Sequence, residues 1–292
     1  SRLLFKRIID SSLVLAMGPP GGGRNPITPR ILRHFNVINY TDMDFESMHL
    51  IFHTILHNFL KLGFSEETQA ISSKIVNATV RVYDTILAEL LPTPSKPHYT
   101  FNLRDLGKVF QGLLMANSRK MGESSDKFLR MWVHENMRVF MDRLINEEDR
   151  SWFMNLCKRE AELTVGCDWN NVKRERILFG DYMVPGADPK IYEEVKDLEA
   201  LVPTIEEYLM DFNAESKTPM KLVMFLDAVE HVSRVSRILR QPQGNALLLG
   251  VGGSGRQSLT RLATFMADFQ LSQSKSARDT GWLSGAKILS KC

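Results

Sequence analysis

The residues best suited to chemistry lie in one glycine-rich stretch. It reads Gly250, Val251, Gly252, Gly253, Ser254, Gly255, Arg256, Gln257 and Ser258. The apolar run 245–249 before it predicts a strand, and apolar residues at helical spacing over 259–266 predict a helix after it. A loop at a helix N-terminus can close backbone N–H groups around an anion, because glycine places no Cβ in the way. The stretch therefore predicts a phosphate-binding loop.

Two phosphate-loop patterns overlap here and predict different ligands. The nucleoside-triphosphate pattern G-x-x-x-x-G-K-[ST] fits Gly250 and Gly255, but Arg256 stands where it has Lys, and its hydroxyl comes one position late, at Ser258. The dinucleotide pattern G-x-G-x-x-G also matches, but it needs a second strand that ends in an acidic residue, and no apolar strand leads to Asp268. The local pattern favours the triphosphate loop and leaves a dinucleotide loop and a purely structural turn open.

Composition bounds the class of protein. A chain of 292 residues with 43% hydrophobic and 24% charged residues predicts an ordinary globular protein of about two domains. The net charge of +3 is spread among acidic residues, so we expect no nucleic-acid partner. We expect no membrane span, because no apolar run reaches about 18 residues. The three cysteines suggest no disulfide framework, and the start at Ser1 suggests a piece of a longer chain.

Helical periodicity dominates residues 41–146. We predict helices over 42–62, 65–91 and 102–115 and another from 125, with Ser65 and Asn102 as N-caps, which together form a four-helix satellite domain. Further helices are predicted over 147–163, over 191–212 with a break at Pro203, and over 219–240 with Thr218 as cap. Short strands are predicted over 12–17, 35–40 and 176–180, and the polar segment 270–292 predicts no regular structure.

Two side-chain groups within these helices invite a functional explanation. Successive histidines of one predicted helix, His49, His53 and His57, are one turn apart and could bind a metal ion. Their apolar neighbours favour an ordinary core position instead. Arg234, Arg237 and Arg240 near a predicted helix C-terminus suit the helix dipole without a nucleic-acid ligand.

Several ordered segments resemble the axonemal dynein heavy chains, at the junction of the third and fourth AAA+ modules of the motor ring. They are LAMGPPGGGRNPITPRILRHFNVI (15–38), HYTFNLRDLGKVFQGLL (98–114), LFGDYMVPGADPKIYEEV (178–195) and LVMFLDAVEHVSRVSRILRQPQGNALLLGVGGSGRQSLTRLATF (222–265). The resemblance implies α/β AAA+ modules with a large helical part. Residues 1–40 would end the third large α/β subdomain, 41–146 would form its helical lid, 147–269 would begin the fourth module, and 270–292 would be a divergent, disordered tail.

The same resemblance implies roles for single residues. Arg33 would be an arginine finger directed at a neighbouring module's nucleotide, and Arg104 a sensor II residue of the lid. Residues 250–258 would bind ATP or ADP, with Ser258 as a candidate Mg²⁺ ligand, and Arg256 in place of Lys puts hydrolysis in doubt.

The family implies an ATP-driven microtubule motor in the cytoplasm and in the axoneme of cilia and flagella. Its partners would be the rest of the motor ring, microtubules and other dynein chains. The acidic strand that holds Mg²⁺ in such modules is not found after the loop, so we expect no independent ATPase activity from this chain. A non-enzymatic interaction or regulatory product and, less favoured, a dinucleotide-dependent oxidoreductase are the alternatives.

Overall fold

The computed structural model describes residues 9–18, 27–273 and 286–290. The chain divides into two compact units, residues 1–43 and 44–292, and each is described by itself. In the first unit the only described helix is α1 (Pro29–Leu32), which begins with Pro29 after the extended residue Thr28.

The strands predicted over 12–17 and 35–40 are not formed. Both segments are irregular, and their apolar side chains are exposed, with Val14 at 95% and Val37 at 73% of full exposure. A strand is stabilised by hydrogen bonds to a neighbouring strand and by burial of one face. Within the described residues no strand pairs with either segment, so the apolar pattern alone does not produce a sheet.

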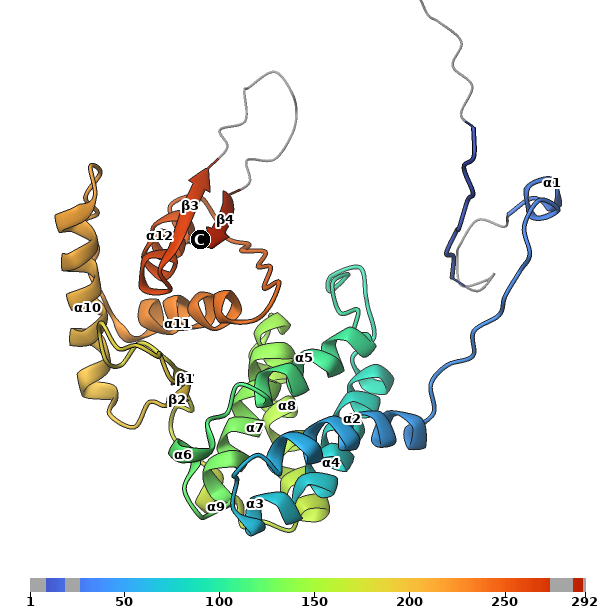
Figure 1. Ribbon diagram of the computed structural model, residues 1–292, viewed down its shortest axis with the longest axis horizontal. Helices are drawn as coiled ribbons and strands as arrows, with labels where there is room; N and C mark the ends of the chain where they lie inside the picture. The colour runs from blue at the N-terminus through green and yellow to red at the C-terminus, as the bar shows by residue number, and fades with distance from the viewer. Residues whose placement is uncertain (1–8, 19–26, 274–285, 291–292) are drawn as a thin grey trace, which may run out of the picture. The chain divides into compact units, whose positions relative to one another are not determined.

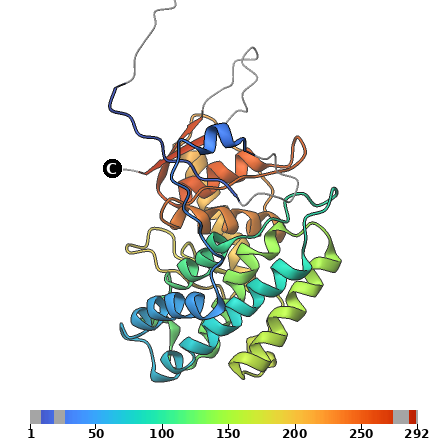
Figure 2. The ribbon, with the colours of Figure 1, turned by 90° about the vertical axis from the view of Figure 1, so that its right-hand side faces the viewer.

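Helices make up the first half of the second unit (Figure 1). They are α2 (Phe45–Leu60), α3 (Glu66–Ala70), α4 (Ser72–Glu89), α5 (Leu103–Leu113), α6 (Ser118–Met121), α7 (Asp126–Val139), a 3₁₀ turn (Met141–Arg143), α8 (Glu147–Glu160), a π turn (Ala161–Val165) and α9 (Trp169–Val172). The caps predicted at Ser65 and Asn102 are confirmed: the Ser65 side chain accepts from Thr68 N, and Asn102 forms a capping box with Asp105. Figures 1 and 2 show α2 and α4 side by side.

These helices share one core of large apolar side chains. Trp132 of α7 is fully buried and its indole N–H donates to Thr79 Oγ1 of α4 at 2.8 Å. Phe153 of α8 is also fully buried, 6.3 Å from the ring of Phe140. Helix α8 therefore packs with the preceding helices and shares their core.

A second core follows, with short strands and three longer helices. Its elements are β1 (Phe179–Gly180), β2 (Glu193–Glu194), α10 (Leu198–Glu215), α11 (Leu226–Arg240) and α12 (Arg256–Met266). Strands β1 and β2 pair antiparallel, Phe179 opposite Glu194. Leu201, Ile205, Val229, Val232 and Leu262 are buried together between the three helices. Helix α12, which follows the glycine-rich loop, is thus held by its apolar face.

Two predicted helix boundaries in this region are wrong. Helix α10 begins after Asp197, which caps its first turn by accepting from the N–H groups of Glu199 and Ala200, and it continues through Pro203. Helix α11 begins after Phe225 rather than after Thr218. The reason is a side-chain clamp: Asn213 bonds both the N–H and the C=O of Met220, at 2.7 and 2.9 Å, which holds this segment in a non-helical turn.

The C-terminal segment also differs from the prediction of a disordered tail. Strands β3 (Phe269–Gln273) and β4 (Ala286–Ser290) form an antiparallel ladder in which Leu271 lies opposite Ile288. The alternation of apolar and polar residues from Phe269 to Gln273 suits a strand. This alternation covers only five residues, so it does not by itself indicate a strand within a polar segment. The remainder of 270–292 lies outside the described residues.

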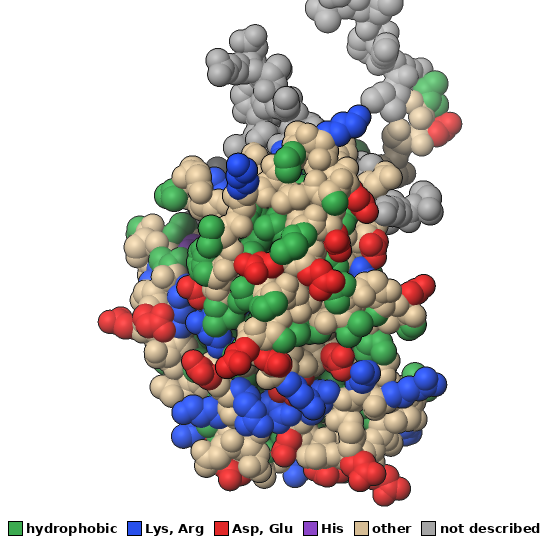
Figure 3. Space-filling model, turned by 90° about the vertical axis from the view of Figure 1, so that its left-hand side faces the viewer, with side chains coloured by type: hydrophobic (Ala, Val, Ile, Leu, Met, Phe, Trp, Pro, Cys, Tyr) green, Lys and Arg blue, Asp and Glu red, His purple; other side chains and the backbone are tan. Residues whose placement is uncertain are grey.

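The surface carries both signs of charge. On the face that Figure 3 shows, a band of basic side chains crosses the lower part of the molecule and acidic side chains border it. Exposed apolar residues of the second unit include Met210, Val223 and Phe225, at 68%, 85% and 59% exposure. None of the described helices is both long enough and apolar enough to cross a membrane.

Candidate functional site

The glycine-rich loop leads into α12 through a turn that needs glycine. Gly253 and Gly255 have φ angles of 84° and 77°, in the left-handed region that favours glycine, and Gly255 is the N-cap of α12. Ser254 N donates to Val251 O at 3.3 Å and closes the turn. The turn therefore delivers the chain to the start of an 11-residue helix, whose N-terminus carries about half a positive charge.

The loop has backbone donors to offer an anion. Among the described residues, the N–H groups of Gly252, Gly253, Gly255 and Arg256 donate to no backbone acceptor. A Cβ added at Gly252 would meet nothing within 4 Å, so the loop has open space beside it. Free N–H groups at a helix N-terminus in an exposed glycine turn fit a phosphate group.

Arg256 lies in the position of the lysine of a triphosphate loop, and its side chain folds back over the loop. Its Nη2 donates to Val251 O at 3.2 Å. A Cβ built on Gly250 would lie 2.9 Å from Ser254 Oγ and 3.5 Å from Arg256 Cδ, so glycine leaves room for these side chains beside the loop. The guanidinium therefore sits at the loop and could move from Val251 O to a bound phosphate.

The strand predicted before the loop is not formed. Residues 245–249 are irregular, and Leu247 and Leu249 are 85% and 82% exposed. As with the earlier segments, no strand in the described part of the chain pairs with this run. The C-terminal end of the loop is thus held by the packing of α12 on α11. Its N-terminal end is not held by pairing with any of the described strands.

Ser258 and Gln257 lie in the first turn of α12. Gln257 is exposed and Ser258 is half-buried. A single hydroxyl is a weak metal ligand, and within the described ranges no group of three or more His, Cys, Asp or Glu side chains could hold a metal ion. The structure thus supplies the phosphate part of the predicted site more fully than the Mg²⁺ part.

Arg33, the predicted finger, belongs to the first unit. It follows the last residue of α1 and is exposed, and its Nε donates to His34 Nε2 at 3.2 Å. Its guanidinium is therefore free to meet an anionic group from elsewhere.

Arg104, the predicted sensor II residue, lies in the first turn of α5 and is exposed. The ion pair with Asp105 that would make it an ordinary helix-surface residue is absent from the described contacts. Asp105 is instead buried and bonded by both Nη atoms of Arg143, with Lys108 at 3.7 Å. The side chain of Arg104 is thus not held by its nearest carboxylate.

Asp268 is not placed where the dinucleotide alternative needs an acidic residue. Asp268 precedes β3, which pairs antiparallel with β4 rather than joining a parallel sheet. The carboxylate of Asp268 lies 2.5 Å from Lys190 Nζ. A ribose contact needs a free carboxylate at the end of a parallel strand, so the geometry disfavours this reading.

The histidine triplet of α2 is a stack of rings. Ring centroids of His49 and His53 are 5.3 Å apart, and those of His53 and His57 are 5.2 Å apart, with nearly parallel planes. Partial burial, followed by the charges of its two neighbours, lowers the pKa of His53 below the usual value. Stacked rings do not converge on one point as metal ligands must.

The arginines of α11 do more than complement a helix dipole. Arg237 bonds the buried carboxylate of Glu135 in α7, and Arg240 bonds Asp181 and the C=O of Lys190. The sequence could not reveal these contacts, because Glu135 is 102 residues away from Arg237 in the chain.

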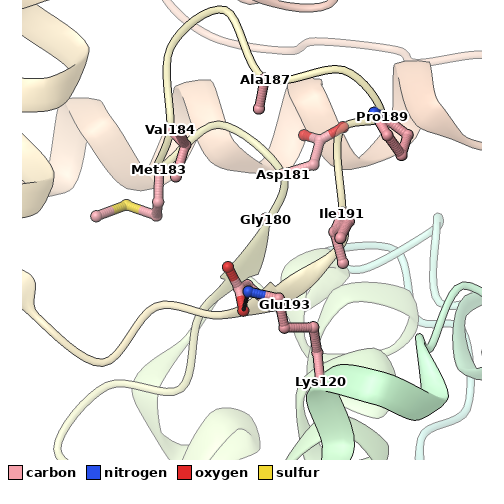
Figure 4. A pocket seen from close by; sticks show the side chains of 9 residues that line it. All are labelled: Lys120, Gly180, Asp181, Met183, Val184, Ala187, Pro189, Ile191 and Glu193. Atoms are coloured by element: carbon pink, nitrogen blue, oxygen red, sulfur yellow. Dashed lines mark ion pairs between the residues drawn. The ribbon is translucent and has the colours of Figure 1, made fainter.

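A cavity of about 130 Å³ is lined mainly by the segment that connects β1 to β2. Figure 4 shows Lys120 reaching toward Glu193 at this cavity. The two charges are 3.3 Å apart. Ligand sites usually enclose about 300–1,000 Å³, so this cavity is too small to hold a nucleotide.

Comparison with known proteins assigns the chain to a family. Three family models match: "P-loop containing dynein motor region" over residues 1–43, "Dynein heavy chain, ATPase lid domain" over 50–150, and "P-loop containing dynein motor region D4" over 220–282. The last range includes the whole glycine-rich loop.

Individual relatives of the chain are also dynein heavy chains. Dynein axonemal heavy chain 1 of Homo sapiens is 49% identical over 95% of this chain and 7% of its own length. Dynein axonemal heavy chain 3 of Mus musculus is 43% identical over 91% of the chain and 7% of its own length. Dynein axonemal heavy chain 6 of Homo sapiens is 42% identical over 95% of the chain and 7% of its own length.

The chain thus spans about 7% of the length of these curated relatives. Its helical half coincides with the matched lid, and α12 with its loop lies in the match to the fourth motor region. The chain belongs to the axonemal dynein heavy chains, as part of their AAA+ motor region.

Proposed function

We propose that the loop 250–258 binds ATP or ADP and serves as a regulatory nucleotide site rather than a hydrolytic one. The observation that carries this proposal is the set of unbonded N–H groups in a left-handed glycine turn at the N-terminus of α12. These donors suit phosphate oxygens, and Arg256 adds a positive charge at the same point.

The substitution of Arg for Lys separates binding from hydrolysis. Arg256 keeps the positive charge, but its planar fork cannot take the compact position of an ammonium group. Removing one well-placed electrostatic group commonly costs about 10²–10³ in rate, roughly 3–4 kcal/mol. Affinity tolerates a displaced contact better than catalysis does, so the nucleotide stays bound and is hydrolysed slowly.

The remaining site residues take their roles from the family. Arg33 acts as an arginine finger toward nucleotide on a neighbouring module, and Arg104 as the sensor II residue of the lid. Ser258 is the candidate Mg²⁺ ligand; the ion, when bound, neutralises phosphate charge. Residues 1–40, 41–146 and 147–269 correspond to the end of the third large subdomain, its lid and the start of the fourth module.

The heavy chain as a whole would be an ATP-driven motor that moves along microtubules in the axoneme of cilia or flagella. This segment would contribute one phosphate loop, one finger and one lid to the motor ring, with the rest of the ring, other dynein chains and microtubules as partners. The names of the relatives support this assignment.

The test is equilibrium binding of fluorescent ATP, ADP and NAD to the purified chain and to Arg256→Ala. Arg81→Ala is the matched control, because it removes the same type of side chain from an exposed position of α4 outside the loop. We expect adenine nucleotides to bind, Arg256→Ala to weaken them at least tenfold, and Arg81→Ala to leave affinity unchanged.

Other results would argue against the proposal. Preferential NAD binding would favour the oxidoreductase, and equal affinity in Arg256→Ala would place the nucleotide away from the loop. Absence of all binding would leave a partner-binding role for the chain. Turnover of ATP by the wild-type chain at ordinary enzymatic rates would refute the regulatory assignment.

A further inference from the structure

The segment between α10 and α11 contains a stretch, residues 220–225, that pairs with no strand among the described residues. Its side chains alternate in burial. Met220 and Met224 are buried in the second core, whereas Val223 and Phe225 are 85% and 59% exposed. An alternation of period two is typical of a β-strand that packs one face on a core. The stretch therefore has the form of a strand without a neighbour.

The main chain of this stretch has unused hydrogen-bonding groups. Among the described contacts, no hydrogen bond reaches the N–H or C=O groups of residues 221–224. Phe225, which ends the stretch, has the extended angles φ −127° and ψ 161°, and its C=O accepts from Val229 N as α11 begins. An exposed extended segment with unpaired N–H and C=O groups is a template for a further strand.

The two edges of the stretch differ. Along a strand, the main-chain groups of alternate residues point to opposite edges. Asn213, near the end of α10, bonds both the N–H and the C=O of Met220, so the edge formed by the even-numbered residues lies toward α10. The opposite edge carries the main-chain groups of Lys221 and Val223 and the N–H of Phe225. This open edge is the one that a second strand can reach.

The outward side chains indicate what a partner strand needs. Val223 and Phe225 offer apolar contacts on the exposed face, and cross-strand pairs of apolar or aromatic side chains stabilise a ladder. Lys221, on the same face, is exposed and has no ion pair with any residue that the structure describes. Antiparallel pairing is the more stable arrangement per residue. An antiparallel partner therefore needs two apolar residues at alternate positions, followed two positions later by a carboxylate opposite Lys221.

A second copy of this chain supplies no carboxylate at that position. Antiparallel pairing of two copies, centred on Val223, would place Lys221 of each copy opposite Phe225 of the other. Parallel pairing in register would place the two Lys221 ammonium groups opposite each other, which is destabilising. The charge pattern therefore favours a different protein chain as the partner.

We propose that residues 221–225 receive a β-strand from a partner protein, which runs antiparallel to them along the open edge. The partner strand carries apolar side chains opposite Phe225 and Val223 and a glutamate or aspartate opposite Lys221. In such complexes the main-chain hydrogen bonds supply affinity and the alternating side chains supply specificity. This surface uses none of the loop residues 250–258 and does not rest on the nucleotide function proposed for them.

The test uses the full 292-residue chain, labelled with ¹⁵N, and the peptide acetyl-Thr-Ile-Thr-Val-Thr-Glu-Thr-amide. Its isoleucine, valine and glutamate share one face of a strand, and their main-chain groups share one edge. A peptide N-methylated at the valine cannot donate to Val223 C=O, whereas N-methylation at the preceding threonine leaves that edge intact. We expect the first methylated peptide to bind at least tenfold more weakly than the parent, and the second to bind like the parent.

Hydrogen exchange of single amides, followed by NMR, tests which edge is used. In the complex with the parent peptide we expect slower exchange at the N–H groups of Lys221, Val223 and Phe225. The N–H groups of Leu222 and Met224, which point to the other edge, should exchange as in the free chain. A contact through side chains alone would not produce this alternation.

Variants of the protein test the same contact. Val223→Pro removes the N–H at the centre of the open edge, and the exposed side chain leaves no packing behind. Val223→Asp removes the apolar contact without altering the backbone, and Leu50→Asp, at a 67% exposed position of α2, is its matched control. We expect both Val223 variants to weaken the parent peptide at least tenfold and Leu50→Asp to leave its affinity unchanged.

Several results would overturn the proposal. They are absence of peptide binding, equal affinity of the two N-methylated peptides, slower exchange at Leu222 and Met224 instead, and unchanged affinity in the Val223 variants. Slow exchange of Val223 N–H before any peptide is added would mean that the chain itself already occupies the edge. Self-association that Val223→Pro abolishes would assign the edge to a second copy. The two N-methylated peptides decide the matter on the unaltered chain if a variant does not fold.

Discussion

The ion pair between Glu135 and Arg237 makes a sharp prediction about stability. Its side chains are 0% and 6% exposed, and it joins α7 of the first core to α11 of the second. Arg237 Nε donates to Oε2 at 3.0 Å, Nη2 donates to the same oxygen, and Tyr192 Oη donates to Oε1 at 3.0 Å. Replacing Arg237 with Met would leave the carboxylate buried with only the tyrosine as partner.

Breaking a buried pair from one side typically costs about 3–5 kcal/mol, because the remaining charge keeps its desolvation cost. For a unit of this size, about 2–4 °C of Tm corresponds to each kcal/mol, so Arg237→Met should lower Tm by roughly 6–20 °C. The double variant Glu135→Gln with Arg237→Met should recover part of this loss, since no charge stays buried.

The assay is urea unfolding followed by circular dichroism, with thermal scans alongside. Lys120→Met is the control, because the pair of Lys120 with Glu193 is 45% and 27% exposed and should contribute only about 0–1 kcal/mol. If Arg237→Met lowers the free energy of unfolding by less than about 1 kcal/mol, or if the double variant recovers none of it, a buried carboxylate without its partner is not what destabilises this variant.

Further predictions concern packing and pH. Gly112→Ala should destabilise by more than about 1 kcal/mol in urea unfolding, because the new Cβ would lie 1.7 Å from Glu135 Oε2, whereas Gly107→Ala meets nothing within 4 Å and should be neutral or stabilising. Asp149 is partly buried, which opposes its ionisation, but hydrogen bonds led by that from Lys96 hold its pKa below the usual value. A lowered pKa stabilises the fold above about pH 4 and loses that contribution as pH falls through the folded-state value, so Asp149→Asn should flatten acid unfolding curves.

The helical half was predictable because its signals are local. The caps at Ser65 and Asn102 and the apolar periodicity fix where those helices start and which face is buried. The glycine turn before α12 was predictable for the same reason, since glycines before an amphipathic helix predict a tight turn without reference to distant residues, and its binding of phosphate stays a prediction. The late start of α11 was not predictable, because the contact of Asn213 with the backbone of Met220 decided it, and neither was the continuation of α10 through Pro203.

The sequence by itself therefore determined most of the helices and the glycine turn before α12, which depend on residue types at short spacing, and its long ordered segments indicated the family. Only the tertiary structure decided whether apolar runs became strands, since 12–17 and 245–249 need hydrogen-bond partners that their own residues do not supply. It also decided which charges meet. Glu135 of α7 and Arg237 of α11 meet between two separate apolar cores, and no local pattern encodes a contact between side chains so far apart in the chain.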